Sequence, residues 1–128
     1  MSKDYKKYLP RHSQDNFYMK ELNELSDENL APLVNDLLLW IKSMNLFISN
    51  EVVNLLKTRH EILKDTLNKH LADPKIDPVF KYNVIAYLIA EFDEEDQKHY
   101  FEELKRLVDN PTEDEVYAEV DLIAKTII

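Results

Sequence analysis

The stretch SDENLAPLVNDLLLWIKSM, residues 26–44, carries the clearest helical pattern in the chain. Ser26 stands before two acidic residues, Asp27 and Glu28, as expected of an N-cap followed by a first helical turn. The segment therefore predicts an amphipathic helix with one buried face. The apolar residues of that face recur every three or four positions and are Leu30, Leu33, Val34, Leu37, Leu38, Ile41 and Met44.

Similar spacing continues on both sides of this segment. It predicts further helices over about 15–25, 50–56, 60–71, 79–92, 93–108 and 113–127. Residues 79–92 are apolar on most sides, which is typical of a central helix packed between neighbours. Thr112 and Glu115 match a capping box at the start of the last helix. The sequence thus predicts an all-α protein with six or seven helices.

Short links between the helices indicate how these helices pack. Consecutive helices joined by a few residues usually lie antiparallel. We therefore favour stacked antiparallel hairpins, a HEAT-like α-α superhelix, over the alternative of an irregular helical bundle, which would have the same apolar pattern. Residues 1–128 are expected to form a single all-helical domain, with residues 1–13 as a candidate flexible N-terminal segment.

The chain contains neither glycine nor cysteine, and both absences restrict its function. Without glycine, Gly-rich nucleotide loops are excluded. Without cysteine, disulfides, thiolate nucleophiles and zinc-thiolate sites are excluded. The longest apolar run, residues 84–90, is far shorter than the roughly 20 residues that span a bilayer. No secretory signal is apparent at the start, so a cytoplasmic location is predicted.

The net charge of the chain is -9, and residues 91–121 carry all of the excess. A negative protein is a poor ligand for the phosphate backbone, so nucleic acid is an unlikely class of partner. The acidic candidates for a protein interface lie in this region: Glu94, Glu95, Glu102 and Glu103.

Four histidines, His12, His60, His70 and His99, were considered for acid-base or metal chemistry. His60 and Glu61 begin like a helical zinc-protease motif, but Lys64 occupies the position of the second ligand. Asp96, His99 and Glu103 would share a helix face, yet a second helix would have to supply further ligands. We favour a solvated charged face, and predict no catalytic residue, no metal ligand and no cofactor.

Three further residues of this part of the chain are singled out: Phe47, Trp40 and Asn45. Phe47 is expected in a loop between helices, where it is an additional candidate interface residue. Trp40 and Asn45 have structural explanations, because an indole can close the end of a helix pair and an asparagine can end a helix.

The chain resembles a small bacterial domain-of-unknown-function family, numbered 5071, through two segments. These are residues 37–45, LLLWIKSMN, and residues 110–113, NPTE, followed by EVDLIA at 119–124. The sequence departs from the family pattern at Leu46 and Phe47, in place of Trp-Pro, and at Phe80, in place of Trp. The resemblance implies a HEAT-like helical domain, chiefly from Firmicutes, and it transfers no catalytic residue.

The leading functional prediction is a non-catalytic protein-protein interaction module. Its acidic helix could bind a basic partner protein, as an immunity-type or regulatory protein does. The alternative is a small-molecule-binding or metal-binding protein, or a small enzyme, with a cleft between hairpins and His60, His70 and His99 as polar candidates. A weak homodimer formed through Leu46 and Phe47 is a third possibility beside a monomer, and no membrane partner is expected.

Overall fold

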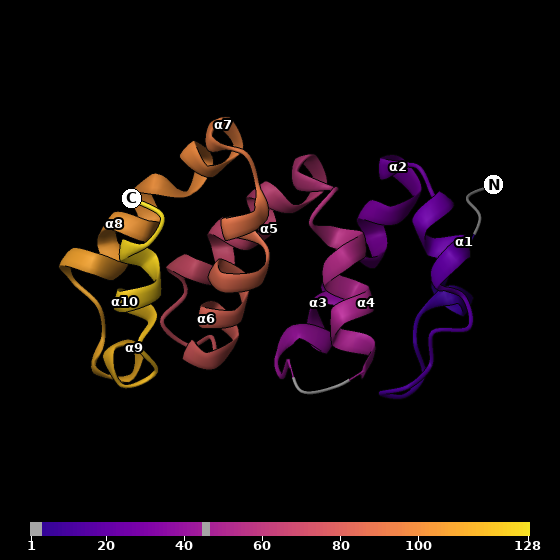
Figure 1. The fold of residues 1–128 in the computed structure, drawn as a ribbon, viewed down its shortest axis with the longest axis horizontal. Coiled ribbons are helices and arrows are strands. Elements are labelled where there is room, and N and C mark those ends of the chain that lie inside the picture. Colours follow the sequence, from indigo (N-terminus) through magenta and orange to yellow (C-terminus); the bar gives the residue numbers. More distant parts are fainter. Residues whose placement is uncertain (1–3, 45–46) are drawn as a thin grey trace.

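The computed structural model describes residues 4–44 and 47–128, and within these ranges the chain forms helices and loops without a strand. The predicted all-α class is therefore confirmed. The helices follow one another along the long axis of the molecule, with α1 near one end and α8, α9 and α10 at the other (Figure 1). The finer prediction of a HEAT-like repeat stays a prediction.

Most elements are short. The α-helices are α1 Met19–Glu24, α2 Asp27–Leu30, α3 Val34–Leu38, α4 Phe47–Leu56, α5 His60–Ala72, α6 Pro78–Tyr87, α7 Glu94–Gln97, α8 Phe101–Asp109, α9 Glu113–Tyr117 and α10 Val120–Lys125. The 3-10 turns are η1 Lys6–Tyr8, η2 Ala31–Leu33, η3 Leu39–Ile41, η4 Ile89–Glu91 and η5 Lys98–Tyr100.

Residues 26–44 bury the predicted face but do not form one regular helix. Ser26 caps α2 by accepting a hydrogen bond from the Asn29 backbone N–H at 3.2 Å. Pro32 has no N–H to continue the ladder, and a 3-10 turn, η2, replaces the α-helix at that point. The apolar face is nevertheless buried: Leu30, Leu33, Val34, Leu37, Leu38 and Ile41 are each at most 3% exposed.

The final segment is also divided. Thr112 and Glu115 form the predicted capping box at the start of α9. Glu119 then takes a left-handed conformation, with φ 64°, between α9 and α10. Because this conformation is unfavourable for a residue with a Cβ, the turn is fixed by the packing of α10 and not by local preference. Val116, in α9, is 48% exposed.

Helix α6 has the central place predicted for residues 79–92. It contacts α5, α10 and the turns η3 and η4. Its side chains Phe80, Val84 and Ile85 are buried in the core. Two aromatic residues lie near the surface: Phe17, which precedes α1, is 72% exposed, and Phe101, the first residue of α8, is 38% exposed.

Residues 4–13 contact the rest of the protein. Tyr5, Tyr8 and Leu9 pack against the core, and the Ile48 backbone N–H donates a 2.9 Å hydrogen bond to the Ser13 carbonyl. Whether residues 1–13 are flexible stays a prediction. In the described ranges, no helix has the length and apolar character needed to cross a bilayer.

Candidate functional site

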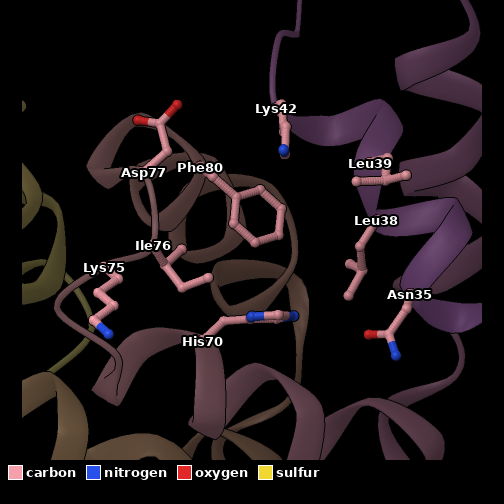
Figure 2. Close-up of a pocket in the computed structure, with 9 residues that line it drawn as sticks. All are labelled: Asn35, Leu38, Leu39, Lys42, His70, Lys75, Ile76, Asp77 and Phe80. Carbon is pink, nitrogen blue, oxygen red and sulfur yellow. The ribbon is translucent and has the colours of Figure 1, made fainter.

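A pocket of about 590 Å³ lies between α3 with η3 on one side and α5 with α6 on the other. Figure 2 shows the side chains around this space. Its apolar surface comes from Leu38, Leu39, Ile76 and Phe80, and its polar groups from Asn35, Lys42, His70, Lys75 and Asp77.

Hydrogen bonds join the two walls of the pocket at one side. The buried Asn83 of α6 donates through Nδ2 to the Ile41 carbonyl at 2.9 Å and to the Lys42 carbonyl at 3.2 Å. Asp77 accepts a 2.9 Å hydrogen bond from the Val79 backbone N–H and so caps α6. One side of the pocket is thus joined to the other by the contact of α6 with η3.

Two polar side chains point into the pocket, and two point away from it. Lys42 directs its ammonium group, and His70 its imidazole, into the space between the walls, whereas Lys75 and Asp77 point outward (Figure 2). The His70 ring meets the ring of Phe80 edge to face, with centroids 5.4 Å apart. Burial lowers the pKa of His70, and the negative charge of Asp73 only partly opposes this. The imidazole is consequently neutral near pH 7.

These groups suit an amphipathic anion. An ammonium group can hold a carboxylate, a neutral imidazole can donate a hydrogen bond, and the leucine, isoleucine and phenylalanine side chains can cover an apolar body. Of the histidines singled out in the sequence, His70 is the one that lines this pocket.

The other histidine of interest, His60, lies apart from the pocket at the start of α5. Its side chain is 6% exposed, and its Nδ1 lies 3.3 Å from an Asp96 carboxylate oxygen on α7. Burial lowers the pKa of His60, opposed by the charge of Asp96. The second helix required for a metal site with Asp96 is therefore present. Glu103, the third residue of the predicted face, instead lies 3.7 Å from Arg106 Nε.

The four acidic interface candidates are not equivalent. Glu94, Glu95 and Glu102 are exposed, while Glu103 is half-buried. Glu95 is paired with Lys98 at 2.9 Å. Glu94 and Glu95 lie in the first turn of α7, where their charge also stabilises the helix. Part of the negative charge of these residues therefore stabilises α7 itself.

The remaining candidate residues from the sequence are Phe47, Trp40 and Asn45. Phe47 was expected in a loop, but it is the first residue of α4; it is 53% exposed and borders a shallow hollow with Gln14 and Asn16. Trp40 is partly buried against the core and borders another hollow, with Lys6, Leu9 and Pro10 among its neighbours. Asn45, predicted to be structural, lies outside the described residues.

Sequence reasoning missed a buried ion cluster. Glu115 accepts from Lys81 Nζ at 2.7 Å and from Arg106 Nη1 at 3.0 Å, and the Lys81 and Glu115 side chains are 0% and 2% exposed. Although burial by itself raises it, hydrogen bonds from Arg106 and Lys81 lower the pKa of Glu115 to about 2. A lysine within an apolar helix and the capping-box glutamate were the available signals.

Two comparisons with known proteins bear on identity. The model of a family described as a domain of unknown function, DUF5071, matches residues 8–128. A search of curated proteins finds no match to the chain.

Proposed function

Because the chain belongs to the DUF5071 family, whose description assigns no activity, we propose a function from the pocket itself: binding of a small organic carboxylate with an apolar body. The observation that carries the proposal is the convergence of Lys42 and His70 on one space with apolar walls (Figure 2).

The size of the pocket supports a small-molecule ligand. Its volume of about 590 Å³ lies within the range of about 300–1,000 Å³ that is usual for ligand sites. Leu38, Ile76 and Phe80 provide the apolar contact area. An apolar ligand body in contact with these side chains would be removed from water, and this burial favours binding.

The polar groups support a negative charge on that ligand. Lys42 brings a positive charge whose partner in the pocket would be a carboxylate, and because Lys42 is exposed to solvent such a pair contributes about 0.2–1 kcal/mol. His70 is neutral and gains a proton more readily once an anion binds beside it. Affinity for the carboxylate is therefore expected to increase as the pH falls through the pKa that His70 has in the complex.

Three probes with one shared body test the proposal: phenylpropionate, phenylpropanol and phenylpropylamine. The expected result is that phenylpropionate raises the melting temperature of the protein while the alcohol has a weaker effect and the amine has none. Lys42→Gln should weaken phenylpropionate binding by up to about fivefold. Lys75→Gln is the matched control, because it removes the same charge from a side chain that points away. Equal binding of the acid and the alcohol, or equal loss in both variants, would contradict the proposal.

A second candidate function is binding of a basic partner protein, of an immunity or regulatory type, through the exposed residues Glu94, Glu95 and Glu102. Its support is the outward position of these three acids on neighbouring helices. It is tested by pull-down from lysate at low and high salt, comparing the wild type with a variant in which Glu94, Glu95, Glu102 and Glu103 are changed to lysine.

A control variant with Glu24, Glu28, Asp36 and Asp65 changed to lysine matches this change in net charge, since these four residues are exposed elsewhere on the protein. Retention of one basic protein by the wild type and the control alone supports the acidic surface. Loss of retention in both variants would attribute binding to net charge and would contradict this candidate.

The setting proposed for either function is a bacterial cytoplasm. A HEAT-like stacking of hairpins and a monomeric or weakly dimeric state are proposed with it. Size-exclusion chromatography with light scattering tests the oligomeric state, and a mass that stays above twice that of the chain on dilution would contradict it.

A further inference from the structure

His60 is a buried polar side chain without a hydrogen-bond partner. The residue is 6% exposed, and in the described residues neither its Nδ1 nor its Nε2 makes a hydrogen bond. An imidazole removed from water in this way loses free energy unless another group takes the place of the water. Its surroundings are therefore of interest, because they contain acidic side chains.

Two carboxylates lie beside His60 Nδ1. An Asp96 oxygen, Oδ1, is 3.3 Å away, and a Glu61 oxygen, Oε1, is 3.9 Å away. One ligand atom from each of the three residues can be chosen so that all lie within 4.8 Å of one another. The three side chains thus lie close enough together to contact one ion.

The distance between His60 and Asp96 fits two ligands of one metal ion better than a direct hydrogen-bonded ion pair. A charge-assisted N–H···O hydrogen bond is usually about 2.7–2.9 Å long. Zinc binds imidazole nitrogen and carboxylate oxygen at about 2.0–2.2 Å, so two ligands at a tetrahedral angle lie about 3.4 Å apart. The distance of 3.3 Å between Nδ1 and Oδ1 matches the second arrangement.

Local structure holds the two contributing helices in position. His60 and Glu61 are the first two residues of α5. Asp96 belongs to α7, where its backbone N–H donates a 3.0 Å hydrogen bond to the N-cap residue Asp93. The contact is thus between the start of α5 and the segment of α7 and η5.

The surroundings of His60 are apolar, and a second imidazole lies nearby. The rings of Phe92 and Tyr100 lie 4.8 and 5.6 Å from the His60 ring, between centroids, and both residues are buried. The exposed His99 has its ring centroid 5.2 Å from that of His60. Rotation of an exposed imidazole can bring one of its nitrogens toward the same point.

We propose that His60, Asp96 and Glu61 bind a divalent transition-metal ion such as Zn²⁺, with His99 as the fourth ligand. The site is separate from the pocket at His70, so neither proposal depends on the other. The mixed nitrogen and oxygen donors favour zinc, cobalt or nickel over magnesium and calcium, which prefer oxygen alone.

One interaction competes with the metal. Lys64 Nζ lies 3.0 Å from Glu61 Oε2, and the ion must draw Glu61 away from it. The Glu61 side chain is 68% exposed, so the ion pair is weak and the carboxylate can turn. Asp96 is accordingly the more important carboxylate ligand.

The test is titration of the purified protein, free of affinity tags, with Co²⁺, followed by visible absorption and by the melting temperature. Co²⁺ replaces Zn²⁺ and reports a tetrahedral site directly through its absorption. The expected result is saturation at one ion per chain and a rise in melting temperature that Mg²⁺ does not reproduce. Zn²⁺ should displace the Co²⁺ signal.

Asp96→Asn is the principal variant, since its side chain is one-third exposed and its replacement conserves shape. We expect it to weaken Co²⁺ binding at least about tenfold. Glu61→Gln should weaken binding less, and provides a second variant if Asp96→Asn is unstable. Glu94→Gln is the matched control, because it removes the same charge from an exposed residue of the same helix. His70→Gln controls for histidine content.

Binding that survives in Glu94→Gln and His70→Gln but is weakened in Asp96→Asn supports the site. Absence of cobalt absorption and of any shift in melting temperature would overturn it. Equal affinity of the wild type and Asp96→Asn would overturn it as well, because the ion would then be bound elsewhere.

Discussion

Replacing Glu115 by glutamine should destabilise the protein strongly. The Glu115 carboxylate holds the ammonium group of Lys81 at 2.7 Å, and the two side chains are 2% and 0% exposed. Glutamine keeps the shape but removes the negative charge, so a buried ammonium ion is left without its counterion. Breaking a buried pair in this way costs about 3–5 kcal/mol. This is a large share of the roughly 5–15 kcal/mol by which natural domains are stable.

Urea denaturation at neutral pH, followed by circular dichroism, measures this loss for Glu115→Gln. The matched control is Glu95→Gln, which breaks the ion pair with Lys98 on the surface and should leave stability nearly unchanged. The double variant Lys81→Met, Glu115→Gln should recover part of the loss, because the fully buried ammonium group is then absent, while the partly buried Arg106 keeps the Leu71 carbonyl and Glu103 as partners. A loss below about 1 kcal/mol in Glu115→Gln would refute the reasoning.

The remaining predictions concern pH and three other positions. Because the folded pKa of Glu115 is about 2, against an ordinary value of 4.5, its stabilisation is complete above about pH 4.5 and is lost as the pH falls through 2. The loss should amount to about 3 kcal/mol and be absent from Glu115→Gln, as measured by urea denaturation at a series of pH values. Leu37→Ala, at a fully buried residue, should cost about 2–5 kcal/mol in the same assay. Trp40→Ala should cost less than Leu37→Ala, because the indole is only partly buried; the reverse order would show that Trp40 belongs to the core. Glu119→Gly should increase stability by about 0.5–1 kcal/mol, since glycine adopts positive φ without strain; a decrease would show that the Glu119 side chain stabilises the turn.

Sequence periodicity identified buried faces better than it identified continuous helices. Leu30, Leu37 and Ile41 are buried as their spacing requires, because an apolar face is selected by the core that it contacts. The same spacing gives no information on where a helix is interrupted. Pro32 was a visible local reason for one interruption, whereas Glu119 adopts its conformation only because α10 packs against α8 and α6.

The candidate sites were much less predictable, because each joins residues from distant parts of the chain. His70 was a polar candidate for a cleft between hairpins, but nothing in the sequence linked it to Lys42, because the pocket forms where α3 and η3 meet α5 and α6. In the sequence, His60 lacks a second ligand on its own helix, because Lys64 occupies that position, and Asp96 lacks ligands from a second helix. The packing of α5 against the α7 and η5 segment supplies the missing partner, which no periodicity within one helix can reveal.

The carboxylate pocket is tested most directly by nuclear magnetic resonance of isotopically labelled protein titrated with phenylpropionate. The account predicts saturable shifts of the His70 side-chain signals and of the Leu38 and Phe80 resonances, with His70 becoming easier to protonate in the complex. Saturable shifts confined to other surfaces, or no saturable shifts at all, would contradict the account.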